Sequence, residues 1–295
     1  MTDYANLITS ALISGLGLGS MYGLLALGFY ITYSVSNTVN FSQGSSMMLG
    51  AVFTFTGSVT WGWPLPLAAL VALLLCAAYG MLVELIAIRP FARRGSNAWL
   101  MSTVALGLVV DNLVLFTFGK EPRGFSLPFA NASMQIAGVG VSPLQLMIPA
   151  VGLSLAGALH LFSRRTRMGK ALLAVVQNRD AASLMGINVS LAVLLAYAAS
   201  TAFAGAAGIM IAPLFNVQAS MGTVFGLKAF AVAILGGITS AWGVMIAGLL
   251  FGVTEALITS LLGSSYTQII TFGLVIVALA FMPNGLFGKA GVNKV

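Results

Sequence analysis

Long apolar stretches follow one another along almost the whole chain, with only short polar segments between them. A helix that spans a bilayer needs about 20 consecutive, mostly apolar residues. Candidate spans lie near 7–33, 45–60, 64–88, 97–118, 142–162, 191–212, 227–240, 243–262 and 266–283. Charged residues make up only 6% of the chain, against about a quarter in soluble domains. We therefore predict an all-α, polytopic integral membrane helix bundle that forms a single domain over residues 1–295.

Two of these stretches, 45–60 and 227–240, are short for a full crossing and are rich in Gly, Ser or Thr. We therefore expect eight or nine crossings, with broken or re-entrant helices among them. Small residues spaced by four form three stripes: Gly15, Gly19 and Gly23; Ser200, Ala204, Gly208 and Ala212; and Gly248, Gly252 and Ala256. Because helices in lipid associate through close backbone approach, these stripes predict a compact bundle.

Basic residues concentrate in short segments and indicate the orientation of the chain. Two segments carry most of them: Arg89, Arg93 and Arg94 in one, and Arg164, Arg165, Arg167, Lys170 and Arg179 in the other. The positive-inside rule places both on the cytoplasmic side, and Lys289 and Lys294 place the C-terminus there. The loop 119–143 and the N-terminus then face outward. These loops account for the net charge of +7, so we do not expect nucleic acid as a partner.

Residue counts exclude several chemistries. His160 is the only histidine and Cys76 the only cysteine, so no His-based metal cluster, catalytic triad or internal disulfide can form. The phosphate-binding pattern GxxxxGK[ST] is absent, which predicts that the chain does not hydrolyse ATP itself. We expect neither enzymatic activity nor a cofactor or metal.

Polar residues at membrane depth are functional candidates, since a charge there costs about 2.5–3.5 kcal/mol on insertion scales. Asp111, beside Asn112, lies near the middle of the span 97–118. It either braces a helix junction or lines a translocation path. Glu255 lies in the span 243–262.

Two further charges near the spans have local interpretations. Glu84 precedes Arg89 by about one helical turn, so we expect it to pair locally. Lys228 stands near the start of the span 227–240, and we expect it to mark a helix end.

The run SVSNTVNFSQGSSMMLGA (34–51) contains polar side chains but no Lys or Arg. Polar, non-helical backbone is tolerated at membrane depth only inside protein or beside a water-filled cavity. Asn40, Ser42, Gln43 and Ser45 are therefore candidates for lining a path. An ordinary turn that caps the following helix is the alternative. Gly236-Gly237 is a second interruption, in the C-terminal half.

Three segments together resemble one family. The segment 15–51 contains Tyr22-Gly23-Leu24-Leu25-Ala26-Leu27-Gly28 and then Asn40-Phe41-Ser42-Gln43-Gly44. It resembles the first helices of permeases from branched-chain amino acid (Liv-type) ABC importers. RTRMGKALLAVVQNRDAASLMGINV (165–189) is similar to the cytoplasmic loop of that family, and 226–257 to its Phe-x-x-x-x-Leu-Gly-Gly signature.

The match departs from the family at the polar turn. The family commonly has Asn-Phe-Ala-His-Gly-Glu, whereas this chain has Gln43 in place of His and Ser45 in place of Glu. The substrate therefore stays open. Branched-chain amino acids are one class, and urea, amides, and aromatic or other small organic acids are others that such permeases serve.

The resemblance implies a permease subunit of a binding-protein-dependent importer in the bacterial cytoplasmic (inner) membrane, which forms the path for a small polar or amphiphilic solute. It implies cytoplasmic ABC ATPase subunits, a second permease subunit (itself or a related chain) and an extracytoplasmic substrate-binding protein as partners, besides the lipid bilayer. The predicted path residues are Asn40, Ser42, Gln43, Ser45, Asp111, Asn112, Gly236 and Gly237. The predicted binding-protein contacts are Lys120, Glu121 and Arg123.

The segment 163–190 is the predicted coupling segment. In DAASLMG (180–186), Asp180 is a natural N-cap and Gly186 a natural left-handed residue after the helix. This part resembles the Glu-Ala-Ala-x-x-x-Gly loop by which such permeases dock on their ATPases, with Asp180 in place of Glu. The predicted coupling residues are Gln177, Arg179, Asp180, Ala181, Ala182, Leu184, Met185 and Gly186. A short helix lying on the membrane surface is the alternative.

Two other functional classes stay open at this stage. One is a stand-alone secondary transporter or channel that uses Asp111 or Glu255. The other is a membrane scaffold without a path. The coupling segment favours the importer, because a transporter acting alone has no need of a docking helix.

Overall fold

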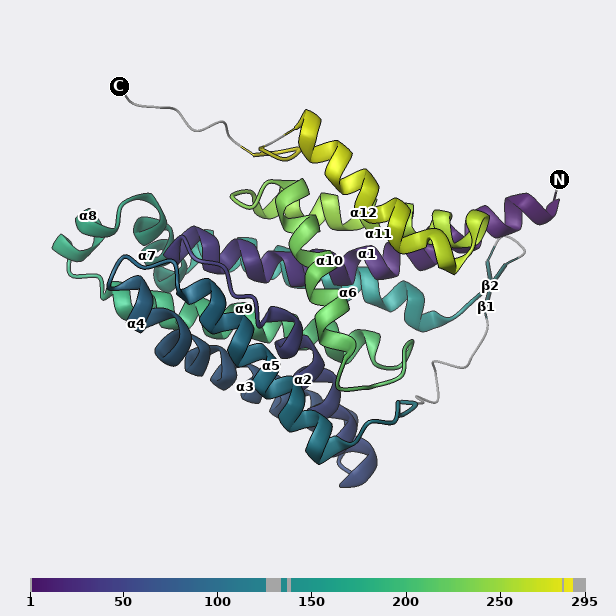
Figure 1. Ribbon diagram of the computed structural model, residues 1–295, viewed down its shortest axis with the longest axis horizontal. Helices are drawn as coiled ribbons and strands as arrows, with labels where there is room; N and C mark the ends of the chain where they lie inside the picture. The colour runs from purple at the N-terminus through teal and green to yellow at the C-terminus, as the bar shows by residue number, and fades with distance from the viewer. Residues whose placement is uncertain (1, 126–133, 137–138, 283, 289–295) are drawn as a thin grey trace.

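A computed structural model describes residues 2–125, 134–136, 139–282 and 284–288 of the chain (Figure 1). Its helices are α1 (Thr2–Ser36), α2 (Gln43–Phe55), α3 (Leu65–Leu82), α4 (Arg89–Ala92), α5 (Trp99–Phe118), α6 (Pro143–Arg165), α7 (Arg167–Gln177), α8 (Arg179–Leu184), α9 (Val189–Ile211), α10 (Met221–Gly236), α11 (Ala241–Leu262) and α12 (Ser264–Phe281). Two π-helical turns, Thr56–Thr60 and Val83–Ile88, continue α2 and α3. A small antiparallel hairpin pairs β1 (Met134–Ile136) with β2 (Val139–Val141), with Met134 opposite Val141.

Seven helices in the described part of the chain are long and apolar enough to cross a membrane. They are Asn6–Ser36, Leu65–Ala92, Trp99–Phe118, Pro143–Arg165, Val189–Ile211, Ala241–Leu262 and Ser264–Phe281. The helices α2 and α10, with 13 and 16 residues, are shorter than a full span. The predicted polytopic bundle is confirmed, and α2 and α10 are the two elements that the sequence marked as short. Lys289 and Lys294, which indicated the side of the C-terminus, lie outside the described residues.

The helix α1 runs along the long axis of the molecule and packs against α11, α9, α6 and α10 (Figure 1). Its contact with α11 is made through glycines. A Cβ on Gly19 would lie 2.7 Å from the carbonyl oxygen of Gly248, and a Cβ on Gly252 would overlap the backbone of Gly19. The first and third predicted stripes therefore face one another, and side chains larger than glycine would force the two backbones apart.

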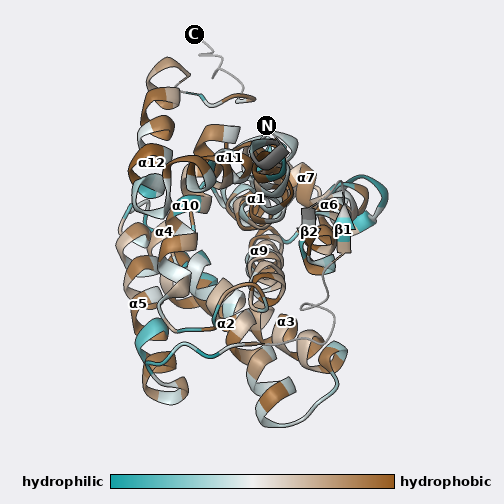
Figure 2. Ribbon diagram, turned by 90° about the vertical axis from the view of Figure 1, so that its right-hand side faces the viewer, coloured by the Kyte–Doolittle hydropathy of each residue, from teal (hydrophilic) through white to brown (hydrophobic). Residues whose placement is uncertain are grey.

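The outer helices present apolar side chains away from the bundle. The ribbons of α5 and α12 are largely hydrophobic at the edge of the molecule (Figure 2). Phe116 on α5 is 85% exposed and Ile269 on α12 is 74% exposed. Large apolar side chains exposed in this way mark a membrane or protein contact.

Of the two predictions for charges near the spans, one is confirmed and one is wrong. Glu84 and Arg89 form an ion pair at 2.8 Å, so the predicted local pairing is confirmed. The expectation that Lys228 marks a helix end is wrong. Lys228 lies inside α10 and is buried, since a partner on α11 compensates its charge.

We expect Gly252→Ala to destabilise the bundle, because the added methyl group would overlap the backbone of α1 at Gly19. Overpacking of this kind costs about 1–3 kcal/mol, and each kcal/mol lowers the midpoint of thermal unfolding by about 1–2 °C in a chain of 295 residues. The measurement is thermal unfolding in detergent. Gly157→Ala is the matched control, because no described residue lies within 4 Å of a Cβ at that helical position. Equal midpoints for the two variants would contradict the packing described here.

Candidate functional site

The polar run 34–51 contains the turn between α1 and α2, residues 37–42, together with the end of α1 and the first turns of α2. The backbone reverses at Asn37, which has a positive φ of 56°. Farther on, the side-chain oxygen of Asn40 accepts hydrogen bonds from the backbone N–H and the hydroxyl of Ser42, at 3.0 and 2.7 Å. Ser42 is the N-cap residue of α2, although its side chain makes no capping bond. Asn40 and Ser42 are fully buried in protein, so these two predicted path residues order the turn.

Gln43 connects three helices. Its amide nitrogen donates to the carbonyl oxygen of Ser200 on α9 at 3.0 Å, and its amide oxygen accepts from the Ser200 hydroxyl at 3.1 Å. The same hydroxyl lies 2.8 Å from the carbonyl oxygen of Gly28 on α1. A Cβ on Gly28 would overlap the Gln43 amide. Gln43 is therefore a brace at the junction of α1, α2 and α9, and the path prediction for it is not supported by its position.

Ser45 and Asp111 do meet at a cavity, which lies between α2, α5 and α10. Its volume is about 140 Å³, which is room for several water molecules. The lining residues are Phe29, Phe41, Gly44, Ser45, Val104, Gly107, Leu108, Asp111, Gly222, Thr223, Gly226, Leu227 and Phe230. The cavity therefore joins residues from both halves of the sequence.

Asp111 is the charged group of this cavity. The Thr223 hydroxyl donates to its Oδ2 at 3.3 Å. Its Oδ1 is buried and makes no hydrogen bond within 3.5 Å to the described residues, with the Ser45 hydroxyl as a further polar neighbour of the carboxylate. The Ser45 hydroxyl lies 3.4 Å from the carbonyl oxygen of Gly107 on the same wall. A buried carboxylate oxygen without a hydrogen bond is costly, and a solute with a hydrogen-bond donor would satisfy it.

The remaining predicted path residues lie elsewhere. Asn112 is exposed and donates at 2.8 Å to the carbonyl oxygen of Leu108 in its own helix. Gly236 is the last residue of α10, and Gly237 follows it with a φ of 84°. The predicted interruption is confirmed there, but neither glycine lines the cavity.

Sequence reasoning missed the contribution of α10 to the cavity. Gly222 and Gly226 pack against Gly44 of α2 at the cavity wall, and Thr223 holds Asp111. The spacing of Gly222 and Gly226 is a small-xxx-small pattern, which marks close helix packing in membranes. It could have placed this face of α10 against α2.

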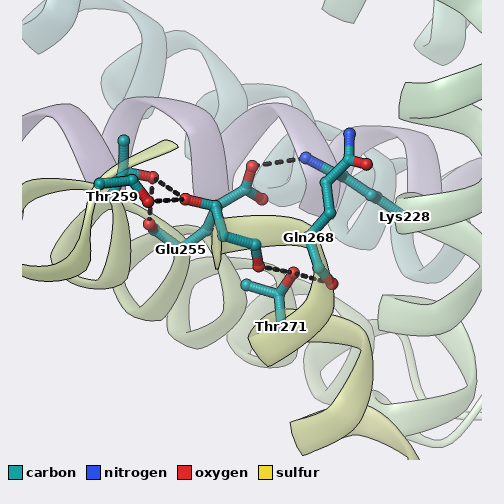
Figure 3. A network of polar contacts seen from close by, with 7 residues as sticks. Lys228, Glu255, Thr259, Gln268 and Thr271 are labelled. Atoms are coloured by element: carbon teal, nitrogen blue, oxygen red, sulfur yellow. Dashed lines mark hydrogen bonds and ion pairs between the residues drawn. The ribbon is translucent and has the colours of Figure 1, made fainter. Parts of the chain in front are cut away.

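Glu255 is not a free carboxylate. Its Oε1 lies 2.5 Å from the Lys228 ammonium nitrogen, and both side chains are buried (Figure 3). Of the three carboxylates in the seven membrane-spanning helices of the described chain, Asp111 is the one without a cationic partner. The alternative of a stand-alone ion-coupled transporter therefore loses one of its two candidate groups.

The coupling segment folds as two short helices, α7 and α8. The residue that caps α8 is Asn178, whose side-chain oxygen accepts the backbone N–H of Ala181 at 3.0 Å. The prediction that Asp180 is the N-cap is wrong, because the extended backbone of Asn178 places the helix start one residue before Asp180. Asp180 lies in the first turn, where a negative charge still complements the helix dipole.

The end of α8 is as predicted. Gly186 has a φ of 82°, and its N–H bonds the carbonyl oxygen of Ser183 at 3.0 Å, while Ile187 bonds that of Ala182 at 3.0 Å. This pair of bonds is a Schellman motif. Just before it, Leu184 is 87% and Met185 is 83% exposed. Two large apolar side chains thus project at the tip of a rigid turn.

Beneath that tip the segment is attached to the bundle. Ala182 and Val175 belong to one buried cluster with Ile31 and Val35 of α1 and with Ala192 and Ala196 of α9. The Arg179 guanidinium donates to the carbonyl oxygen of Val35. The helices α7 and α8 lie at the end of the molecule that also holds α4, opposite the hairpin (Figure 1). A displacement of α8 would therefore act on α1 and α9 directly.

The predicted binding-protein contacts lie after α5. Lys120, Glu121 and Arg123 are exposed. The Arg123 guanidinium stacks 4.3 Å from the centre of the Phe118 ring and donates to the Phe118 carbonyl oxygen at 2.6 Å. Its backbone also pairs with Val217. Arg123 therefore fastens this loop to the segment before α10, while Lys120 and Glu121 stay candidates for a partner.

The sequence matches the family described as "branched-chain amino acid transport system / permease component" over residues 11–279. The chain belongs to this family. It is 32% identical to the high-affinity branched-chain amino acid transport system permease protein LivH of Escherichia coli K12, over 96% of each chain. It is 32% identical to BraD, a permease of the same description from Pseudomonas aeruginosa, over 96% of this chain and 97% of BraD. A more distant relative is the D-allose transport system permease protein AlsC of E. coli, at 26% identity.

Membership of this family establishes the general role of the chain. It is a permease of an ABC importer and is not itself catalytic, because separate ATPase subunits hydrolyse the ATP. The recognition made from the three sequence segments is confirmed over nearly the whole chain.

We expect Gln43→Ala to lower stability, since it removes the hydrogen bonds that join α2 to α9 and leaves a void at full burial. Loss of buried hydrogen bonds costs about 1–3 kcal/mol. Asn112→Ala is the control, because Asn112 is exposed and bonds only its own helix; a surface change of this kind stays within about 0.5 kcal/mol. Thermal unfolding in detergent compares the two. A Gln43→Ala protein as stable as Asn112→Ala would show that Gln43 is not a brace.

Proposed function

We propose that this chain is the membrane-spanning permease subunit of a binding-protein-dependent importer in the bacterial cytoplasmic membrane. The cavity between α2, α5 and α10 forms part of its path for a small polar or amphiphilic solute. The observation that carries the proposal is Asp111, a carboxylate that lines this cavity beside Ser45 and Thr223 and has no cationic partner among the described residues. A carboxylate is costly at membrane depth and typically marks a pathway for a solute or ion.

The lining of the cavity suits an amphiphilic solute. Asp111, Ser45 and Thr223 supply a carboxylate and two hydroxyls, while Phe29 and Phe230 supply apolar surface. A branched-chain amino acid or a related small organic molecule combines both characters, and LivH and BraD are named for branched-chain amino acids.

Gln43 and Ser45, the two residues in which the turn departs from the family, differ in their expected effect on substrate selectivity. Gln43 is engaged in the brace to Ser200 and does not line the cavity. Ser45 does line it. A change of selectivity relative to the relatives is therefore expected to come from Ser45 and not from Gln43.

Three exposed parts of the bundle are the proposed contacts with partners: the tip of α8, the loop after α5 and the outer face of α5. Leu184 and Met185 are the apolar contacts of α8 for a cytoplasmic ATPase, and Gly186 sets the rigid turn beneath them. Lys120 and Glu121 face the substrate-binding protein outside. The cavity is bounded on one side by α5, whose outer face carries exposed Leu113 and Phe116. A second permease subunit, either a copy or a related chain, covers this face and completes the path.

We expect Asp111→Asn to reduce ATP-driven uptake about ten-fold or more, because a hydrogen bond to a charged group contributes about 1.5–3 kcal/mol and each 1.4 kcal/mol is a factor of ten. The measurement is uptake of radiolabelled leucine, and of a panel of small amides and organic acids, by proteoliposomes with the whole importer. Asn112→Ala, one residue away but outside the cavity, should transport normally. Uptake by Asp111→Asn within two-fold of the parent would exclude the cavity from the path, as a factor near two is under 0.5 kcal/mol.

We expect Gly186→Val to leave the permease inserted but to uncouple uptake from ATP hydrolysis. Among the residues that the structure describes, none lies within 4 Å of a Cβ at Gly186. The effect therefore comes from the backbone, where a φ of 82° costs a branched residue about 1–3 kcal/mol. The readout is solute transported per ATP hydrolysed.

Gly263→Val is the matched control for this experiment. Gly263 has a φ of 91° and equally open space, but it lies in the turn between α11 and α12. If both variants reduce the ratio of solute to ATP equally, α8 is not the coupling element.

A further inference from the structure

A buried ion pair joins α10 to α11 away from the cavity. The Lys228 nitrogen and the Glu255 oxygen are 2.5 Å apart, and the two side chains are 7% and 10% exposed. Each is the only charged residue of its helix. Figure 3 shows Lys228 reaching from α10 toward Glu255, beside the contact of Thr259 on α11 with α12. The path proposed above makes no use of this pair.

Stability does not account for the pair. Burying two charges costs several kcal/mol each, and apolar residues of similar volume often serve as well or better. Glu255 Oε2 is buried and lies outside the ion pair, and the Glu255 carboxylate also interacts with the Tyr22 hydroxyl. The ring centre of Tyr22 is 5.9 Å from the Lys228 nitrogen, so this buried tyrosine contacts both members of the pair. An intramembrane pair retained at this cost is a functional candidate.

The position of the pair on α10 indicates what it does. Thr223 and Lys228 are five residues apart, which at 3.6 residues per turn places them about 140° apart around the helix axis. Thr223 faces the cavity and bonds Asp111 on α5, whereas Lys228 faces α11. A rotation of α10 about its axis would therefore break both contacts together.

Other contacts of α10 restrain such a rotation less. Gly222 and Gly226 meet the backbone of Gly44, and Gly236 meets Gly243, so these faces carry no side chain that interlocks. Phe225 and Phe230 pack on aromatic rings at 5.0 to 6.1 Å, and such contacts keep their energy over a range of offsets. Separating two membrane-buried charges leaves both unpaired, which is far more costly.

We infer that Lys228 and Glu255 are positioning residues of the translocation path: their ion pair sets the rotation of α10 and so holds Thr223 against Asp111. The expected effect of the pair on transport rests on the proposed role of the cavity. Its effect on the position of Thr223 relative to Asp111 does not depend on that role.

The test compares thiol crosslinking between Asp111→Cys and Thr223→Cys, made in a Cys76→Ala background, with and without the ion pair. The pair is removed by Lys228→Met together with Glu255→Met, which replaces both charges at similar volume. The reagent is a short bis-methanethiosulfonate applied to the full importer in proteoliposomes. We expect the crosslinking yield to fall about three-fold or more while the thermal midpoint stays at the parental value, since the replacement is near neutral for stability.

The same pair of methionines is then tested with Asp111 and Thr223 intact. We expect a lower ratio of solute to ATP at unchanged stability. If the pair were merely structural, replacing it by two methionines at unchanged stability would leave both the crosslinking yield and the ratio of solute to ATP at their parental values. A double-methionine protein with parental stability, parental crosslinking and parental coupling would overturn the inference.

Two further variants keep the test decisive. The exchanged pair, Lys228→Glu with Glu255→Lys, retains an ion pair and should crosslink within about two-fold of the parent. A stable exchanged protein that no longer crosslinks would overturn the inference. This holds even if the methionine variant fails to accumulate. Thr259→Val with Thr267→Val removes the 2.9 Å contact of α11 with α12 and should leave crosslinking unchanged. Failure of the proposed path appears separately, as unchanged uptake in Asp111→Asn.

Discussion

Direct backbone contact between α1 and α11 is the interaction on which the bundle depends. In lipid, helices gain little from burying apolar side chains against each other, so van der Waals contact between closely approaching backbones supplies the attraction. Gly15, Gly19 and Gly23 meet Gly248 and Gly252 with no room for a Cβ at the closest points. This seam makes α1 the centre of the molecule, with α9, α6 and α10 arranged around it. The short helices α2 and α10 are then held inside protein, where broken helices are tolerated.

The polar groups in this bundle divide into braces and a cavity. Asn40, Ser42 and Gln43 are satisfied by one another and by α9, and they hold the start of α2 in place. Only two residues farther on, Ser45 turns to the cavity, where one oxygen of Asp111 makes no hydrogen bond to the described residues. Rigid, fully bonded polar groups next to an incompletely bonded one are the arrangement expected of a site that must keep its shape and still bind a passing solute.

The same helices connect the cavity with the coupling segment. The tip of α8 carries Leu184 and Met185, and its base packs on α1 and α9 through Ala182 and Arg179. The helix α9 is bonded to α2 through Ser200, and α2 forms one wall of the cavity. Motion at α8 therefore reaches the cavity through packed helices and one buried hydrogen-bond network. On the other side of α10, away from the cavity, Lys228 pairs with Glu255 of α11.

The sequence by itself determined the membrane class, the family, the two short helices and the left-handed end of α8 at Gly186, because apolar length and local backbone preference are encoded in neighbouring residues. It did not distinguish a brace from a path residue in 34–51, and it placed the cap of α8 at Asp180 instead of Asn178. The Lys228–Glu255 pair and the contact of Thr223 with Asp111 were decided by the tertiary structure alone. These residues are 27 and 112 positions apart, and helices that are apolar all round carry no pattern that tells which face meets protein and which meets lipid.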